Sequence, residues 1–243
     1  MRMWERFPEL TRAVAQAHKE VGLVASGHDM DHDLEVAELA LVVAWDHDES
    51  AAVLAGVAGL LHSMDRILER RLSLSQETIS TVPEEVVREV LCEMLHQYVC
   101  IDAADRDRVI GAVIHHGSKP NREGDDLVTI ALADADRLAN MGATLPIRSG
   151  QHHSRVRILN PVTIQVDYSE RHPREKYNHP DSVLWDIQNA VNWYRQSDGL
   201  YALRLPKALE IGKIRAERLE RLIEDILAER ALVGLYPYPT SLL

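Results

Sequence analysis

The sequence predicts an all-α protein, and three observations support that prediction. Hydrophobic residues make up 46% of the 243 residues but aromatic residues only 5%, so Ala, Leu, Val and Ile must form most of the core. Such side chains suit closely packed helices. Apolar residues recur at intervals of three and four along most of the chain, which is the periodicity of an amphipathic helix. Prolines and polar segments fall at the borders of these stretches, where helices begin and end.

The N-terminal third predicts three helices. Pro8 can occupy the first turn of a helix that ends near Gly22. After a polar stretch, Val36, Leu39, Ala40 and Val43 repeat at helical spacing and mark a second helix. The third, 51–61, is almost wholly apolar and rich in small residues, so we expect it to be the buried central helix, with His62 at its end.

The remainder of the chain predicts further helices and one irregular stretch. Helical periodicity returns in five segments, which are 83–94, 105–116, 127–141, 184–194 and 206–231. Between Gly142 and Pro180 this pattern is interrupted. The strings RVRIL and VTIQV flank Asn160-Pro161 there, and they could form a short β-ribbon near 155–168. We therefore expect a helical bundle with a C-terminal helical extension.

Charge and composition exclude several classes of function. A formal net charge of −11 disfavours stable binding of nucleic acid, which relies on basic side chains that neutralise phosphates. The two cysteines are too few for a disulfide framework. The N-terminus lacks the apolar core of a signal peptide, and no stretch approaches the roughly 18 uninterrupted apolar residues needed to cross a bilayer. We therefore expect a soluble, cytoplasmic protein without a membrane partner.

Histidines and carboxylates gather in three short motifs at or near predicted helix ends. The motifs are GHDMDH, with His28 and His32; LLHSMD, with His62 and Asp65; and ADADRLANM, with Asp134 and Asp136. Taken singly, each such residue is more often a helix cap or a solvated side chain. Imidazole and carboxylate groups from separate helices can together bind Mn, Fe, Co, Ni or Zn, and such an ion can activate water for hydrolysis.

In their order and context, these motifs resemble those of the HD-domain superfamily of metal-dependent phosphohydrolases. The succession of a His, a His-Asp doublet and an Asp corresponds to His32, His62 and Asp136, and the third motif is similar to the DADRL-like motif of bacterial members. The resemblance implies a single HD-type domain over 1–243, with the metal-site core at about 20–145 and an irregular segment and C-terminal helices over 146–243. It also implies that His32, His62 and Asp136 bind a divalent metal ion, whether Mn, Fe, Co, Ni, Zn or Mg.

The chain departs from this pattern at the second residue of the doublet, where Ser63 replaces the aspartate. A neutral hydroxyl is a much poorer ligand for a divalent cation than a carboxylate. Three interpretations stay open: Asp65 could supply the missing carboxylate; a weaker site could be helped by His96, His115 or His116; or the protein could have lost efficient catalysis.

The resemblance implies hydrolysis of a nucleotide or related small phosphoester. Asp65 and His116 are the candidate catalytic residues, either to position water or to protonate the leaving group. Lys119 and Arg122, in the loop after His116, could meet a phosphate. The alternative is a non-catalytic ligand-binding or regulatory protein with the HD fold; an oxidative di-iron site ranks last. A homo-oligomer is left open.

Overall fold

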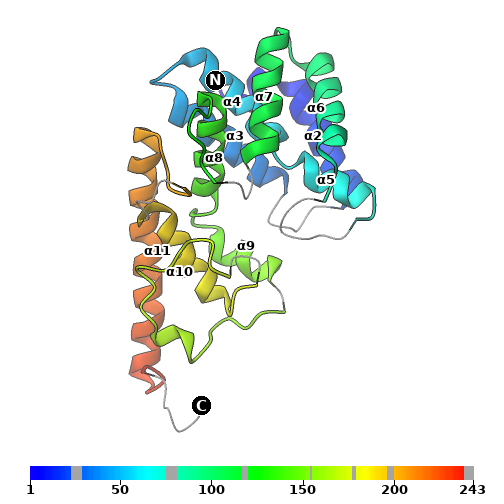
Figure 1. The fold of residues 1–243 in the computed structure, drawn as a ribbon. Coiled ribbons are helices and arrows are strands. Elements are labelled where there is room, and N and C mark those ends of the chain that lie inside the picture. Colours follow the sequence, from blue (N-terminus) through cyan, green and yellow to red (C-terminus); the bar gives the residue numbers. More distant parts are fainter. Residues whose placement is uncertain are drawn as a thin grey trace. The chain divides into compact units, whose positions relative to one another are not determined.

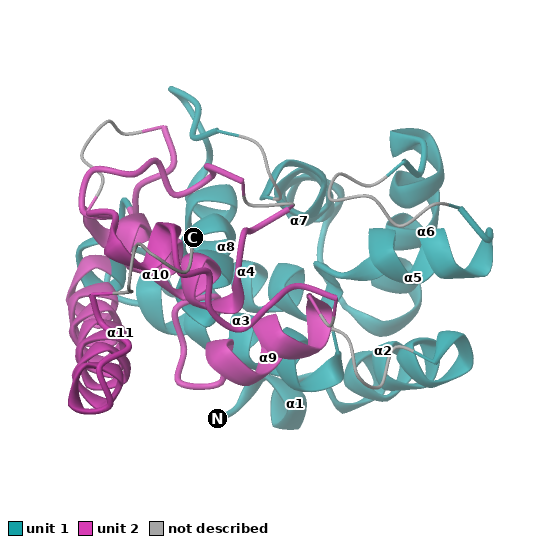
Figure 2. Ribbon diagram, turned by 90° about the horizontal axis from the view of Figure 1, so that it is seen from below, with its two compact units in different colours: residues 1–139, 204–208 teal, residues 140–203, 209–243 magenta. Residues whose placement is uncertain are grey.

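The computed structural model describes residues 1–22, 29–74, 81–116, 120–153, 155–176, 179–195 and 200–237. These residues form α-helices, one 3-10 helix, turns and loops, and no strand occurs among them (Figure 1). The expected all-α fold is confirmed. The chain divides into two compact units, coloured separately in Figure 2: residues 1–139 with 204–208, and residues 140–203 with 209–243.

The first unit begins with a short helix, α1 (Met3–Arg6), and the predicted helix α2 (Pro8–Val21). Pro8 lies in the first turn of α2, where a missing backbone N–H costs nothing. Gly22 ends the helix in the left-handed conformation, with φ of 70°, which glycine adopts without steric cost. Both predicted boundaries of this helix are therefore correct to within a residue.

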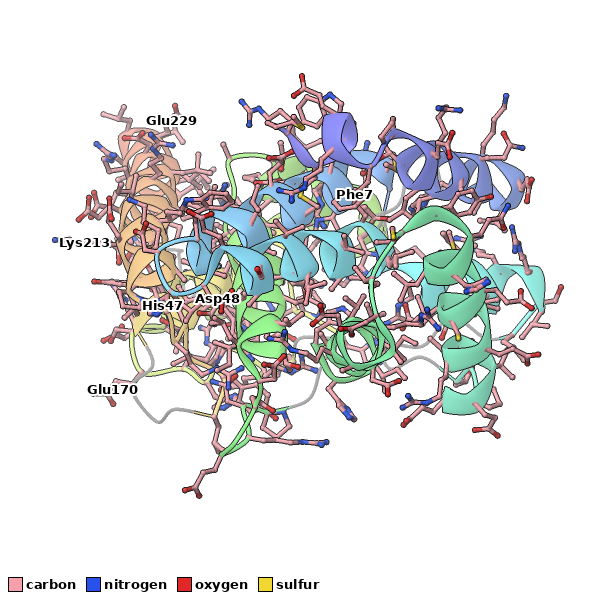
Figure 3. All side chains as sticks on the ribbon, turned by 90° about the horizontal axis from the view of Figure 1, so that it is seen from above. Phe7, His47, Asp48, Glu170, Lys213 and Glu229 are labelled. Carbon is pink, nitrogen blue, oxygen red and sulfur yellow. The ribbon has the colours of Figure 1, made fainter. Side chains whose placement is uncertain are left out.

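Two helices at the centre of the first unit, α3 (Met30–Ala44) and α4 (Glu49–Leu61), are fixed at their starts by aspartate caps. The Asp29 side chain accepts a hydrogen bond from the backbone N–H of His32, and the Asp48 side chain accepts one from Ala51. Figure 3 labels Asp48 in the turn between the two helices. From Ala51 onward α4 is buried on nearly every side, as the apolar run in the sequence predicts.

A glycine allows α3 and α4 to approach closely. A Cβ atom on Gly59 would lie 2.5 Å from the Cα of Ala37, far inside van der Waals contact. Only a residue without a side chain fits between the two backbones at this point. This close approach also brings together two histidines, because His32 lies on α3 and His62 follows directly after α4.

Four more helices complete the first unit: α5 (Met64–Arg71), α6 (Glu84–Tyr98), α7 (Ala103–His116) and α8 (Leu127–Ala139). Helix α8 packs against α3, α4 and α7, so the helices that carry the three sequence motifs are in mutual contact. Buried Asp134 on α8 accepts hydrogen bonds of 2.8 Å from the backbone N–H groups of both Arg204 and Leu205. This carboxylate therefore fixes the chain just before the last helix.

The second unit contains α9 (Leu145–His152), a 3-10 helix η1 (Thr163–Gln165), α10 (Val183–Arg195) and most of α11 (Pro206–Leu232). The short β-ribbon expected near 155–168 is not formed by the described residues there. Asn160 explains the difference: its side chain accepts from the N–H of Val162 and its backbone carbonyl from the N–H of Ile164. These local bonds make a turn and the 3-10 helix, and compete with strand pairing.

Amide side chains of α10 hold the irregular segment in place. Asn192 donates hydrogen bonds of 2.7 Å to the carbonyls of Tyr168 and Arg171, and Asn189 donates one to the carbonyl of Glu175. Asn189 and Asn192 are buried, so the loop finds inside the protein the donors that water would otherwise provide. On α11, Lys213 and Glu229 project outward from the helix (Figure 3).

One helical stretch, Glu49–Arg71, is long and apolar enough to cross a membrane. However, 83% of its most apolar window is buried inside the protein. It corresponds to α4 and α5, the core of the first unit, so this burial is consistent with a soluble protein.

Candidate metal centre

Side chains from three helices converge at one point of the first unit. Ligand atoms of His32, His62 and Asp136 all lie within 4.8 Å of one another, an arrangement that could hold a metal ion. His32 comes from the first turn of α3, His62 from the end of α4 and Asp136 from α8. The structure therefore brings together the three residues that the sequence motifs singled out as metal ligands.

His32 is oriented by its place in α3. The Asp29 cap holds the backbone N–H of His32 at 3.0 Å and thereby fixes the first helical turn. The His32 side chain is fully buried, and its Nε2 atom lies 3.4 Å from Oδ1 of Asp136. The ring of His32 meets the ring of His62 edge to face, with 5.0 Å between their centroids.

His62 has its tautomer set by the backbone. Its Nδ1 atom lies 2.7 Å from the carbonyl oxygen of Gly59, one turn earlier in α4. Since a carbonyl oxygen can only accept, Nδ1 must carry the proton, and the lone pair of the neutral ring is on Nε2. This is the usual arrangement for a histidine ligand, whose second nitrogen donates to a carbonyl or carboxylate.

Asp136 is the anionic member of the group. Burial alone raises the pKa of this carboxyl, but the hydrogen bond with His32 and the neighbouring charges of His62 and His32 outweigh it, so the pKa lies well below its usual range. Asp136 is thus ionised at neutral pH. Asp134, two residues earlier, points to another side of α8 and binds the 204–205 backbone instead.

His116, at the end of α7, lies beside the convergent group. Its Nδ1 donates to the carbonyl of Val113 at 2.6 Å, and its ring meets that of His62 with 5.4 Å between centroids. Burial, followed by the neighbouring charge of His62, lowers the pKa of His116. His116 therefore offers a neutral imidazole at neutral pH, next to the three candidate ligands.

The other histidines and carboxylates proposed from the sequence either are not in the convergent group or lie outside the described chain. Asp65, near the start of α5, accepts a hydrogen bond from the backbone N–H of Arg66 and is not in the convergent group found among the described residues. His96 is exposed on α6. His28 and Lys119 lie outside the described residues.

Sequence reasoning missed a buried partner of Ser63, which is Asp33, and the buried partner of Asp33 in turn, which is His18. The Ser63 hydroxyl donates to Oδ1 of Asp33 at 2.6 Å, and Oδ2 of Asp33 lies 2.7 Å from Nε2 of His18. A signal was available, because Asp33 falls three and four residues before the apolar residues Val36 and Ala37, on the buried face of α3. A charged residue in that register predicts a buried polar cluster.

The donor set fits a divalent transition metal. Two imidazoles and one carboxylate suit Mn, Fe, Co, Ni or Zn better than the all-oxygen set that Mg and Ca prefer. The tautomer imposed on His62 places a free ring lone pair where a metal ligand needs it, and Asp136 keeps its charge at neutral pH. Three protein ligands also leave coordination positions for water or a substrate oxygen.

Comparison with known proteins supports the fold. No family model matches the sequence, and no match to a curated protein was found. A structural-genomics protein from Lactobacillus plantarum aligns with 94% of this chain and 98% of its own, with a TM-score of 0.61 and 18% identity. YpgQ from Bacillus subtilis, solved in complex with ADP, aligns with 89% of this chain and 97% of its own, with a TM-score of 0.53 and 20% identity. At this identity the similarity shows a shared helical fold.

Proposed function

We propose that this protein is a metal-dependent phosphohydrolase that acts on a nucleotide or a related small phosphoester. The observation that carries the proposal is the convergence of His32, His62 and Asp136 within 4.8 Å. The order of the three motifs, which resembles that of HD-domain phosphohydrolases, supports the same function. A divalent ion bound there would act as a Lewis acid and lower the pKa of a coordinated water.

The protein side chains have separable roles in this proposal. His32, His62 and Asp136 hold the ion, and Asp136 supplies the negative charge. His116 lies next to His62 and is neutral at neutral pH, so it can take a proton from the attacking water or later give one to the leaving oxygen. The negative charge of Asp65 raises the pKa of His116, and we assign it to stabilising that imidazole once it has taken up a proton.

A nucleotide is the proposed substrate class because YpgQ, which shares the fold, was solved with ADP. The net charge of −11 makes the bound metal the main attraction for an anionic phosphate, since the protein as a whole repels it. We therefore expect phosphate-containing ligands to bind the metal-loaded protein much more tightly than the metal-free protein. We propose a cytoplasmic location for such an enzyme.

The experiment begins with metal content, measured by inductively coupled plasma mass spectrometry on the purified protein. The metal-loaded protein is then assayed for phosphate release from nucleoside mono-, di- and triphosphates. The His116→Ala variant should keep its metal, because His116 is outside the convergent group, but lose about 10²- to 10⁴-fold in kcat. Unchanged kcat in this variant would refute the role of His116, and a metal-free wild type that binds no added ion would refute the metal centre.

The second candidate is a non-catalytic protein that binds phosphorylated ligands without turnover. Ser63 favours it, because the doublet position lacks a carboxylate. The two functions are separated by isothermal titration with ADP and by product analysis on the same metal-loaded sample. Saturable binding with no phosphate release over many hours would select the binding protein, whereas release that depends on metal and on His116 would select the enzyme.

A further inference from the structure

Ser63, which stands where the His-Asp doublet has its aspartate, is part of a buried chain of polar side chains. Ser63 is 1% exposed and sits in the turn between α4 and α5. Its Oγ lies 3.4 Å from Nε2 of His62, the nitrogen with the ring lone pair, and 2.6 Å from Oδ1 of Asp33. The hydroxyl thus lies between a candidate metal ligand and a buried carboxylate.

The direction of the Ser63 hydrogen bond follows from its acceptor. An ionised carboxylate can only accept, so the Ser63 hydrogen points at Asp33. The two lone pairs of Oγ are then directed away from Asp33 and remain available to a further partner. With Nε2 of His62 at 3.4 Å, an ion bound to that nitrogen is the partner that this geometry suits.

Asp33 is anchored from its other side by a different helix. It is fully buried on α3, and its Oδ2 lies 2.7 Å from Nε2 of His18 on α2, which is itself 3% exposed. A buried carboxylate needs such partners, because desolvation of an unpaired charge is very costly. His18, Asp33 and Ser63 therefore form a continuous chain from α2 through α3 to the end of α4, which we call the buried relay.

We propose that Ser63 is a fourth protein ligand of the metal, and that Asp33 provides from behind it the negative charge that a doublet aspartate would provide directly. The inference rests on the metal centre of the proposed function. Asp33 is a positioning residue: it accepts the serine proton in a hydrogen bond, makes Oγ a better donor to the ion and fixes its direction. The negative charge thus lies one residue further from the ion than it would with an aspartate at position 63.

The metal preference of the site follows from its charge. Its ligands are two neutral imidazoles, one neutral hydroxyl and one carboxylate, so only one negative charge lies on a ligand, and that of Asp33 acts indirectly through the Ser63 hydroxyl. Ions that bind imidazole strongly, such as Zn²⁺, Co²⁺ and Ni²⁺, should be retained, and Mg²⁺ should bind weakly.

Replacing Ser63 by aspartate, which would restore the His-Asp doublet, should therefore destabilise this protein. An aspartate at position 63 would place its carboxylate against that of Asp33, in the interior, where Ser63 Oγ and Asp33 Oδ1 are now 2.6 Å apart. Two carboxylates this close cannot both be ionised without a large cost. The paired change S63D/D33N removes the repulsion, because an asparagine amide at position 33 can donate to the new carboxylate while its oxygen still accepts from His18.

The test is titration of the full-length protein with Zn²⁺ and Co²⁺ by isothermal calorimetry, together with thermal unfolding of the metal-free form. Six variants are compared with the wild type: S63A, D33N, S63D, S63D/D33N, H32A and E38Q. Glu38 lies on the same helix as Asp33 and accepts a hydrogen bond from the Met3 N–H, away from the site, so E38Q controls for damage to α3. The visible spectrum of bound Co²⁺ reports on the number of ligands.

We expect S63A and D33N to weaken Zn²⁺ binding about 10- to 100-fold and to change the Co²⁺ spectrum, while E38Q leaves both unaltered. S63D alone should lower the unfolding temperature, and S63D/D33N should recover it and bind at least as tightly as the wild type. Wild-type affinity and spectrum in S63A would overturn the inference, as would a stable, tightly binding S63D single variant. H32A separates the two proposals. Suppose that the wild type and S63A bind Zn²⁺ equally well and that H32A does not bind it. In that case the metal centre stands and the proposal that Ser63 is a ligand fails. If the wild type itself binds neither ion, both proposals fail.

Discussion

Two of the histidines near the candidate centre share one device, a hydrogen bond from Nδ1 to the carbonyl three residues earlier. His62 makes it to Gly59 and His116 to Val113, each at the end of a helix. Carbonyls in the last turn of a helix have no partner within it, so they are available as acceptors. A histidine at a helix end is thereby held with Nε2 directed outward, which explains why such positions suit metal ligands and proton carriers.

Replacing His62 by alanine should abolish tight metal binding. The change removes one of three convergent ligands and should weaken Zn²⁺ binding by at least about 100-fold, as measured by calorimetry. His47 is an exposed histidine in the turn before α4 (Figure 3), so H47A is the matched control and should bind like the wild type. Equal loss in both variants would mean that Zn²⁺ binds surface histidines.

Metal affinity should fall on acidification, and the histidines should be the cause. Metal ligands must be deprotonated, and imidazoles protonate below a pH of about 6.5. The pKa of Asp136 lies well below its usual range, so this carboxylate stays charged throughout and contributes no loss. Calorimetry between pH 8 and pH 5 should show an affinity that falls with pH, because protons compete with the metal ion for the imidazole nitrogens. Affinity that persists to pH 5 would argue against imidazole ligands.

Gly59 sets the distance between α3, which carries His32, and α4, which His62 follows. In G59A the new methyl group would lie 2.5 Å from the Ala37 Cα, so α3 and α4 must move apart. We expect a loss of about 1–3 kcal/mol in the free energy of unfolding, together with weaker metal binding. Chemical denaturation and calorimetry measure the two effects.

The control for this change is Gly111, on α7, where an added Cβ meets nothing within 4 Å. G111A should raise stability by about 0.5–1 kcal/mol, because alanine is the better helix former. If G59A were as stable as G111A, the close approach of α3 and α4 would not be required by the fold.

The spacing of apolar residues predicted most helices, because a helix that is buried on one side needs apolar residues every three or four positions. The helices over 8–21, 127–139 and 206–232 agree with the sequence pattern to within a few residues. Three short helices were missed: α1, which has four residues, and α5 and α9, which have eight each. So short a segment spans barely two turns, which is too few for a periodic signal.

The sequence predicted which three residues converge at the candidate site, but not the residues that surround them. His32, His62 and Asp136 stand in recognisable motifs, and the structure brings them together. The contact of Ser63 with Asp33 joins residues 30 positions apart and that of Asp33 with His18 joins residues 15 apart. Such contacts depend on how α2, α3 and α4 pack, which periodicity alone does not specify.

For the whole molecule, metal binding should appear as added thermal stability. The three candidate ligands come from α3, α4 and α8, which are far apart in the unfolded chain, so an ion held by them would bind the folded protein selectively. At a free Zn²⁺ concentration 100 times Kd, the stabilisation is about 2.7 kcal/mol. For a chain of this size the unfolding temperature should rise by roughly 5–10 °C in differential scanning calorimetry, and chelator should reverse it. H32A should show no rise, and an equal rise in that variant would indicate binding elsewhere.

The contact between Ser63 and Asp33 should limit which residues homologues can carry at positions 33 and 63. If one buried carboxylate is needed near the metal and two are not tolerated, the two positions cannot diverge independently. Among homologues, an acidic residue should occur at position 33 or at position 63, but rarely at both. A lineage that moves from one arrangement to the other must pass through a neutral intermediate with weakened metal binding, so each arrangement should persist within its own branch of the family tree.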